Sequence, residues 1–235
     1  MTLQPLDLTR RSFIWRKLIA AGARFAEVNA CATAMDFGNA DAELAVARRM
    51  GLADLSGLPR TGYKGRGALD WLRGQGVKVP EENNCALPQP DDTLACRLAP
   101  SELLLLGGLD GTPGLCADLD AAWPGADAGT GAYKVPRPET NLWFALTGDA
   151  AGTMFSKICG VDLRASHFPN HAIAQTQVAR LSAIVVRADL ASTPAFHLLA
   201  DSASAGYVLT VLLDAMAEYD GALVGLSALR RLAEA

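Results

Sequence analysis

The sequence predicts an α+β protein built from antiparallel sheets with helices packed on them, arranged as two lobes. Three observations predict this class. The order strand, helix, strand, strand, helix occurs twice along the 235 residues. A cluster of glycine and proline at 124–138 separates the two occurrences and marks a lobe boundary. Each occurrence also contains a helix followed by a Gly-Val pair, Gly76–Val77 in the first and Gly160–Val161 in the second.

The first lobe spans residues 1–130 and includes an N-terminal helix. Its other elements are a strand near 58–64, a helix near 67–74, strands near 93–98 and 102–107, and a helix near 114–122. Leu69 and Leu72 lie on the same side of the first of these helices, as an amphipathic helix requires. A tight turn at 99–101 predicts that the two following strands form a hairpin.

The second lobe spans residues 131–235. Its elements are a strand at 141–148, a helix near 150–159, a strand at 174–188 with a hairpin partner at 195–201, and helices at 204–219 and 222–233. Met154, Phe155 and Ile158 share one helical face. The segment 174–188 is rich in β-branched residues, which predicts one long strand. The two lobes are expected to pack as one module.

Composition excludes several classes of protein. The formal net charge is −4, which provides no basic field for nucleic acid. The apolar runs are too short to cross a bilayer, and no secretory signal follows the N-terminal basic residues, so we expect no membrane partner and a cytoplasmic location. The odd number of cysteines with no close pair predicts free thiols that serve in packing: Cys31, Cys85, Cys96, Cys116 and Cys159.

The stretch RTGYKGRGALDWL at 60–72 raises the question of a phosphate-binding loop. Its glycines follow the order G-x-x-G-x-G, whereas a dinucleotide loop needs G-x-G-x-x-G between a parallel strand and a helix. The residues therefore favour a turn in which Gly65 and Gly67 redirect the chain while Lys64 and Arg66 are solvated. Anion binding stays the alternative.

Other candidate sites are weak. His167 and His171 have a spacing that suits a metal on a helix, but Pro169 between them argues against a helix, and we expect no metal site. Arg180 and Arg187 alternate out of an apolar strand, either toward solvent or toward acidic groups of a partner. We assign no catalytic residue. The aromatic residues expected in the core are Trp143, Phe144, Phe155 and Phe168.

Residues 18–72 resemble the opening of the glycine-cleavage T-protein (aminomethyltransferase) superfamily. The matching pieces are Gly22–Ala23–Arg24, Glu43, Ala47–Arg48, Gly51–Leu52 and Asp54–Leu55–Ser56. The remainder is similar to one branch, the gamma subunits of heterotetrameric sarcosine oxidase, through residues 97–107, 146–187 and 196–216. The resemblance covers about residues 18 to 217.

This resemblance implies a two-lobed aminomethyltransferase fold of the folate-binding type, without the C-terminal β-barrel of the full T-protein. It implies a non-catalytic subunit that scaffolds the large alpha subunit of a complex oxidising an N-methyl amine such as sarcosine. The implied partners are larger alpha and beta subunits and a small delta subunit. FAD, FMN and NAD are implied for those partner subunits, and no cofactor is implied for this chain.

The resemblance also points to Asp91 and Asp92 as folate-binding candidates. In the T-protein, a carboxylate before the corresponding strand faces the folate amine, and a carboxylate suits pterin N–H groups. A solvated Asp-Asp turn is the simpler interpretation. The alternative function is therefore a stand-alone tetrahydrofolate-dependent one-carbon transfer protein. The T-protein has an Arg-Thr-Gly-Tyr-x-Gly-Glu motif late in its chain, and RTGYKGR at 60–66 is similar to it in letters. We interpret this likeness as accidental, because Arg66 stands in place of the glutamate and the stretch lies early in this chain.

Overall fold

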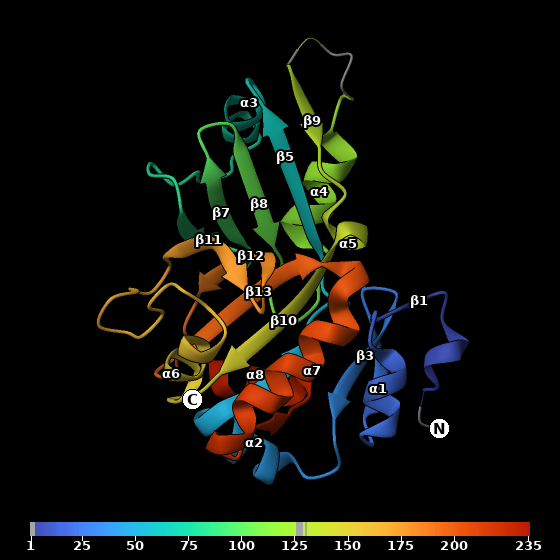
Figure 1. Ribbon diagram of the computed structural model, residues 1–235. Coiled ribbons are helices and arrows are strands. Elements are labelled where there is room, and N and C mark those ends of the chain that lie inside the picture. Colours follow the sequence, from blue (N-terminus) through green and yellow to red (C-terminus); the bar gives the residue numbers. More distant parts are fainter. Residues whose placement is uncertain (1–2, 126–128, 130) are drawn as a thin grey trace.

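The computed structural model describes residues 3–125, 129 and 131–235. Two large open sheets share one apolar layer, and helices cover their outer faces (Figure 1). The N-terminal region forms a small third sheet. The predicted α+β class with antiparallel sheets is confirmed, since all strand pairs of the large sheets are antiparallel except the short β14–β4 pair.

The five-stranded sheet has the order β6-β7-β8-β5-β9. Its strands are β5 (Arg60–Gly65), β6 (Cys85–Pro88), β7 (Leu94–Ala99), β8 (Glu102–Leu106) and β9 (Ala132–Lys134). Helices α3 (Ala68–Gly74) and α4 (Gly114–Ala122) cover its outer face, where Tyr63, Leu103 and Leu105 are fully buried. The predicted β7–β8 hairpin is confirmed.

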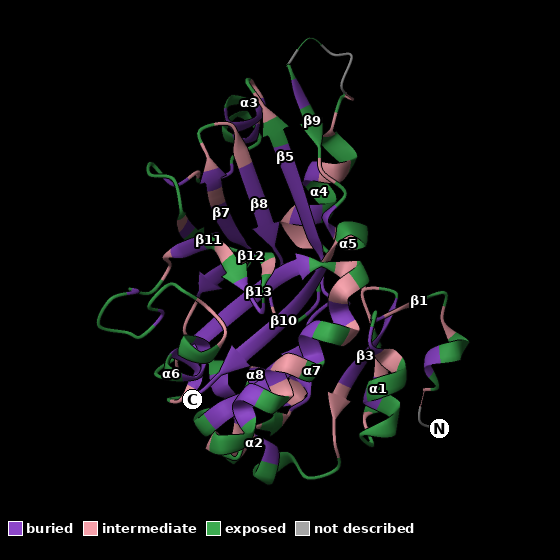
Figure 2. Ribbon diagram, viewed as in Figure 1, coloured by how far each residue is buried: buried purple, intermediate pink, exposed green. Residues whose placement is uncertain are grey.

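The six-stranded sheet has the order β11-β12-β13-β10-β4-β14. Its strands are β4 (Gly51–Asp54), β10 (Asn141–Thr147), β11 (Ile173–Val178), β12 (Leu181–Arg187), β13 (Ala195–Asp201) and β14 (Ala222–Leu223). Its outer face buries Phe144, Phe196 and Leu198 against α6 (Ala151–Met154), α7 (Ala205–Met216) and the turn η2 (Phe155–Lys157). Burial is continuous along its central strands (Figure 2).

The N-terminal region forms the third sheet, of order β1-β3-β2. Its elements are η1 (Pro5–Asp7), β1 (Arg10–Arg11), α1 (Trp15–Ala20), β2 (Arg24–Val28) and β3 (Cys31–Asp36). The remaining elements are α2 (Ala40–Met50), α5 (Arg137–Thr140), η3 (Ser202–Ser204), η4 (Ala217–Tyr219) and α8 (Leu226–Ala233). None of the described helices is long and apolar enough to cross a membrane.

The stretch 60–72 forms β5 and the turn into α3, as predicted. Gly65 has φ +119°, and a Cβ there would lie 2.3 Å from the carbonyl oxygen of Gly131. This position therefore requires glycine. Lys64 is exposed, as predicted, and its Nζ also pairs with Glu102 at 2.9 Å.

The predicted single strand at 174–188 is wrong. The segment is the hairpin β11–β12, and the chain turns at Ala179 and Arg180, whose φ values are +52° and +65°. Two successive residues with positive φ form the tight turn that suits strand twist, although glycine or asparagine usually fills it. The predicted pairing with the strand at 195–201 is confirmed for its second half, β12.

Arg187 also differs from the expectation. It is neither solvent-facing nor directed at a partner, because it is buried and forms a bidentate pair with Asp189 of the same chain, at 2.9 and 2.7 Å. The predicted core aromatic residues Trp143, Phe144, Phe155 and Phe168 are all buried. All five cysteines are free, three of them buried.

Strand pairing crosses the expected boundary between residues 130 and 131 in both directions. Residue 130 itself lies outside the described residues. Strand β4 belongs to the first range but pairs with β10, and β9 belongs to the second range but pairs with β5. The five-stranded sheet is therefore built from one continuous segment, which is inserted between two adjacent strands of the six-stranded sheet. The division of the chain into two lobes at residues 130 and 131 stays a prediction.

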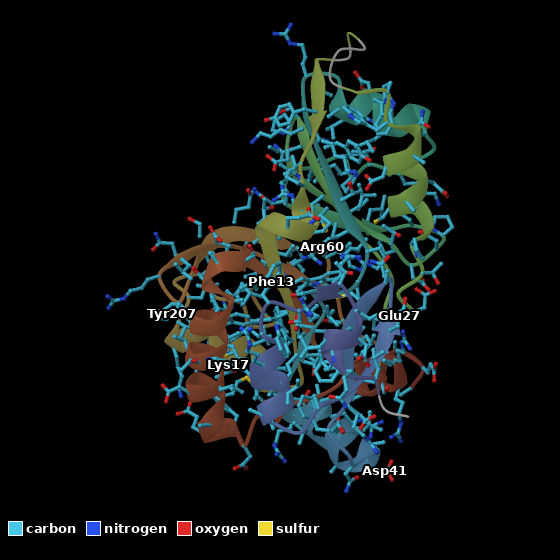
Figure 3. All side chains as sticks on the ribbon, turned by 90° about the vertical axis from the view of Figure 1, so that its right-hand side faces the viewer. Phe13, Lys17, Glu27, Asp41, Arg60 and Tyr207 are labelled. Atoms are coloured by element: carbon cyan, nitrogen blue, oxygen red, sulfur yellow. The ribbon has the colours of Figure 1, made fainter. Side chains whose placement is uncertain are left out.

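Arg60 lies where the chain passes between the two sheets (Figure 3). It is 2% exposed, and its guanidinium donates to the carbonyl oxygens of Ser56 at 2.8 Å, Pro138 at 3.0 Å and Asn141 at 2.7 Å. The first acceptor precedes β5, the second lies in α5, and the third is the first residue of β10. Burial lowers the pKa of Arg60 to about 10, so the side chain is still charged at neutral pH.

Candidate functional site

A cleft of about 610 Å³ opens at one edge of the apolar layer between the two large sheets. This volume is within the usual range for small-molecule sites. One wall comes from the β6–β7 turn and the loop after β8, the other from the ends of β10, β12 and β13, and the last turn of α8 closes one side. The titratable residues that line it are Asp92, Asp110, His171, Asp189, His197, Arg230 and Glu234.

The structure separates the two sequence-predicted site residues. Asp92 lines the cleft, is exposed and has φ +61°. The Asp91 carboxylate is already hydrogen-bonded within the chain, because it accepts from the backbone N–H of Leu115 at 2.9 Å and from the Thr93 hydroxyl at 3.0 Å. Desolvation raises the pKa of Asp91, but these hydrogen bonds outweigh it and the pKa is lowered.

His197 presents a hydrogen-bond donor in the cleft. The Nε1–H of Trp143 donates to Nδ1 of His197 at 3.0 Å, across the adjacent strands β10 and β13. Burial lowers the pKa of His197 to about 4, so the imidazole is neutral at pH 7. Because Nδ1 accepts a hydrogen bond, the proton of the neutral ring is on Nε2.

Three charged groups of the cleft are fixed by contacts within the chain, whereas the carboxylate of Glu234, which also lines it, has no such contact among the described residues. Asp189 holds Arg187 by the bidentate pair. Arg230 donates to the carbonyl oxygens of Leu109 and Asp110, both at 2.8 Å. The Asp110 carboxylate accepts from the backbone N–H of Thr112 at 3.0 Å. Of the aspartates that line the cleft, Asp92 alone has no such partner among the described residues.

The cleft therefore offers the Asp92 carboxylate as an acceptor and the His197 imidazole as a neutral donor on opposite walls, over an apolar floor that includes Leu94, Leu106 and Trp143. This arrangement suits a planar, partly polar ring that has both N–H donors and a carbonyl acceptor. A carboxylate together with a neutral imidazole of low pKa favours binding over proton transfer, since a general base needs a pKa closer to the operating pH.

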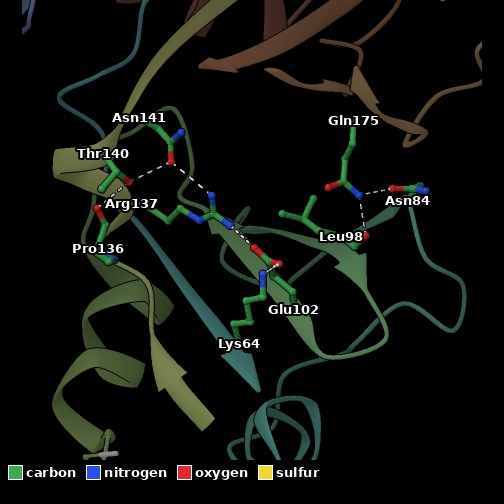
Figure 4. Close-up of polar contacts among 9 residues, drawn as sticks. All are labelled: Lys64, Asn84, Leu98, Glu102, Pro136, Arg137, Thr140, Asn141 and Gln175. Carbon is green, nitrogen blue, oxygen red and sulfur yellow. Dashed lines mark hydrogen bonds and ion pairs between the residues drawn. The ribbon is translucent and has the colours of Figure 1, made fainter. Parts of the chain in front are cut away.

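A second hollow, of about 740 Å³, lies over the part of the six-stranded sheet that extends beyond the five-stranded sheet. Its lining includes neutral polar side chains such as Gln175, Gln177 and Ser182. Figure 4 shows its surroundings: Gln175 donates to Asn84 and to the carbonyl of Leu98, both at 2.7 Å. Opposite, Glu102 accepts from Arg137 at 2.6 Å. The Gln175 contacts join β11 to β7 and to the residue before β6, whereas the Glu102–Arg137 contact joins β8 to α5. We assign the hollow no ligand.

The histidine pair considered for metal binding is not brought together with other ligands. Nδ1 of His167 lies 2.8 Å from the hydroxyl of Ser166 and 3.2 Å from a carboxylate oxygen of Asp162, whereas His171 lines the cleft. Within the described part of the chain, no group of three or more His, Cys, Asp or Glu residues is arranged to hold a metal ion.

Sequence reasoning missed His197 and Trp143 as a site pair. They are 54 residues apart, and each lies in an apolar strand that looks like plain core. A polar histidine in the run AFHLLAD was the available signal, because a buried histidine needs a hydrogen-bond partner. Identifying that partner requires the β10–β13 register, which pairs Trp143 with Leu199 and Ala145 with His197.

Comparison with known proteins gives a fold but no family by sequence. No family model matches the chain, and no curated protein matches it. Its structure is similar to the glycine cleavage system aminomethyltransferase T from Bartonella henselae, with a TM-score of 0.72 and 17% identity over 95% of this chain and 62% of that one. The chain thus spans less than two thirds of that enzyme.

The structure is also similar to a chain of the heterotetrameric sarcosine oxidase from Corynebacterium sp. U-96, solved in complex with pyrrole 2-carboxylate. The TM-score is 0.65 and the identity 19%, over 92% of this chain and 99% of that one. At these identities the likeness establishes the fold, which is that of the T-protein and of this sarcosine oxidase chain, as the sequence predicts.

Proposed function

We propose that this chain is the gamma subunit of a heterotetrameric, flavin-dependent oxidase acting on sarcosine or a related N-methyl amine, and that it scaffolds the large folate- and NAD-binding alpha subunit. The observation that carries the proposal is the fold likeness to a chain of a heterotetrameric sarcosine oxidase, which extends over 92% of this chain and 99% of that one with a TM-score of 0.65. The resemblance of residues 97–107, 146–187 and 196–216 to the gamma subunits supports it.

The chemistry of the cleft supports a binding or scaffolding role. Of the five charged residues that line the cleft, Asp110, Asp189 and Arg230 hold the fold together. Asp92, Glu234 and neutral His197 have side chains that remain free to meet a ligand among the described residues. In the proposed complex, FAD, FMN and NAD belong to the alpha and beta partners, a small delta subunit completes the assembly, and the complex is cytoplasmic.

The test is native purification of a tagged form of the full chain from its source. We expect larger subunits that carry flavin to co-purify in fixed ratio, and the preparation to consume oxygen when sarcosine or another N-methyl amine is added. Subunit identity is read by mass spectrometry and bound flavin by visible absorbance. A chain that purifies alone, without flavin, under mild conditions contradicts the proposal.

Asp92 favours a second candidate, a tetrahydrofolate-dependent one-carbon transfer protein. The residues present fit a pterin: the Asp92 carboxylate accepts from ring N–H groups, and Nε2–H of His197 donates to a ring carbonyl. Tetrahydrofolate would supply the nitrogen atoms that carry the one-carbon unit, while this chain binds and orients the ring.

Calorimetry with tetrahydrofolate tests this candidate on the isolated chain. Asp92→Asn should weaken binding by at least about tenfold, because a charge-assisted hydrogen bond contributes about 1.5–3 kcal/mol. The matched variant Asp91→Asn should bind like the wild type, since the Asp91 carboxylate is turned toward Thr93 and Leu115. Absence of binding to the wild-type chain eliminates the candidate and leaves the scaffold proposal standing.

A further inference from the structure

The surface of α1 combines exposed aromatic and apolar side chains with cations. We call it the α1 patch and define it by Arg11, Phe13, Trp15, Arg16 and Ile19. Phe13 and Ile19 are each 43% exposed, which is high for large apolar residues. Figure 3 looks onto this side of the molecule, with Phe13 and Lys17 on the α1 segment and Tyr207 on the neighbouring helix α7.

The patch is held firmly against the body of the protein. Ile14 and Leu18 are buried beneath it, 3% and 1% exposed. Lys17 donates from Nζ to the carbonyl of Gly206 at 3.0 Å and to the Thr210 hydroxyl at 2.9 Å, which ties α1 to α7. The exposed side chains are therefore presented by a fixed backbone, so that little conformational entropy is lost when they are covered.

The cations of the patch have no acidic partner within the described chain. Arg11 and Arg16 both lie over the Trp15 ring, with their Cζ atoms 5.6 and 4.7 Å from its centroid. Neither takes part in any of the ion pairs found among the described residues. Two guanidinium groups on one indole repel each other, and an external carboxylate would relieve that repulsion.

The local charge contrasts with the chain as a whole, which has a net charge of −4. Tryptophan, phenylalanine and arginine are also the residues that protein interfaces gather at their centres, whereas they are uncommon together on a free surface. Charge and composition therefore both indicate that a protein surface with carboxylates covers this patch.

We propose that the α1 patch is the docking surface for an acidic, partly apolar segment of a larger flavin-bearing partner subunit. The partner's carboxylates pair with Arg11 and Arg16, and its apolar side chains cover Phe13, Ile19 and the indole of Trp15. This inference rests on the proposed function, to which it adds the surface that makes the contact.

Two other occupants fit the patch less well. A second copy of this chain in a two-fold dimer would place the patch against itself and oppose like charges. An anionic membrane would face a chain of net negative charge and a helix of only six residues, Trp15–Ala20, with one side packed against the protein.

The experiment compares two charge-reversal variants of the full tagged chain purified from its source. Arg11→Glu/Arg16→Glu alters the patch, and Arg66→Glu/Lys78→Glu changes the charge equally at two exposed cations that flank α3. We expect the first variant to retain at least about tenfold less flavin-bearing subunit than the wild type, because like charges in an interface cost several kcal/mol. The control variant should retain the wild-type amount.

Each outcome has a distinct meaning. If the wild-type chain carries no flavin subunit, the proposed function fails. If the wild type and both variants carry the same amount, the function stands and the α1 patch proposal is wrong. Equal circular dichroism and melting temperature of both variants exclude misfolding as the cause of a loss.

Hydrogen exchange gives an independent measurement on the wild-type complex. Amides of α1 should exchange more slowly in the complex than in the isolated chain, and those of α3 should not change. Flotation with vesicles of phosphatidylserine and phosphatidylcholine tests the membrane alternative. Binding to these vesicles that Arg11→Glu/Arg16→Glu abolishes, with no change at α1 in the complex, overturns the proposal.

Discussion

Arginines in two regions of this protein have opposite surroundings. Within the sheets, Arg60 and Arg187 are almost fully buried, and each of their guanidinium nitrogens donates to an acceptor of the same chain. In the α1 patch, Arg11 and Arg16 stack on Trp15 and form no ion pair with a carboxylate among the described residues. The interior arginines are therefore structural, whereas those on α1 are available to something outside the chain.

The difference gives a criterion for assigning a role to an arginine in this protein, for which we assign no catalytic residue. An arginine whose donors all meet carbonyl or carboxylate oxygens stabilises the fold, and replacing it should unfold the protein. An arginine that the fold does not need should affect association alone. The following substitutions test that contrast in order of decreasing effect on stability.

Replacing Arg60 should have the largest effect. Arg60→Met leaves several buried carbonyl groups without a donor and removes the cation nearest to the buried Asp54, so we expect a loss of about 4 kcal/mol in the free energy of unfolding. Urea denaturation measures it. Arg66→Met, at an exposed turn, is the control and should change stability by less than about 0.5 kcal/mol.

His197 should give the next largest effect, in the pH dependence. Its pKa is about 4 in the folded protein, below the ordinary histidine value of 6.5 that applies to the unfolded chain, so the unfolded chain binds the proton first as pH falls. The free energy of unfolding should therefore fall by about 3 kcal/mol in total as the pH is lowered from 6.5 to 4. His197→Gln should lack this part of the slope. Identical pH profiles for variant and wild type would show that the imidazole is not buried as described.

Substitutions of the two adjacent aspartates should have smaller effects on the free energy of unfolding, and the two effects should differ from each other. Asp91→Asn weakens the hydrogen bonds to Leu115 and Thr93, and should cost about 1 kcal/mol, as the loss of a helix-capping contact does. Asp92→Asn should change stability by less than about 0.5 kcal/mol, because asparagine tolerates the positive φ at this position. Thermal unfolding of the two variants in parallel measures the difference, and equal losses would contradict the assignment.

Arg11→Glu/Arg16→Glu should have the smallest effect on the isolated chain. We expect a change within about 0.5 kcal/mol, since exposed charges without partners contribute little to folding. A strong destabilisation would place these residues with Arg60 and Arg187 and remove the contrast between the two regions.

Much of the fold was predictable because local pattern agrees with tertiary structure there. Strand β5, helix α3 and the β7–β8 hairpin lie where glycine, apolar spacing and the turn at 99–101 put them. The β11–β12 turn was missed because Ala179 and Arg180 are not turn residues, and only sheet pairing imposes their conformation. The helix at 222–233 begins late for a similar reason, since β14 first pairs with β4.

The candidate site was predictable only in part. Asp91 and Asp92 were found together by the resemblance, but the sequence contains nothing that distinguishes them, because the φ of Asp92 and the approach of α4 to Asp91 are properties of the folded chain. His197 could not be assigned, since its importance depends on Trp143 in a neighbouring strand. Arg187 was placed on the wrong side because its partner, Asp189, follows the end of its strand.

The insertion of one sheet into the other has a consequence for the order in which the chain folds. All strands of the five-stranded sheet come from residues 60–134, so their contacts are comparatively local. Strand β4 must wait for β10, about ninety residues later, and β14 is added near residue 222. Because closing a long loop costs entropy before it yields contacts, the inserted sheet should form first during synthesis, and the site between the sheets should appear last.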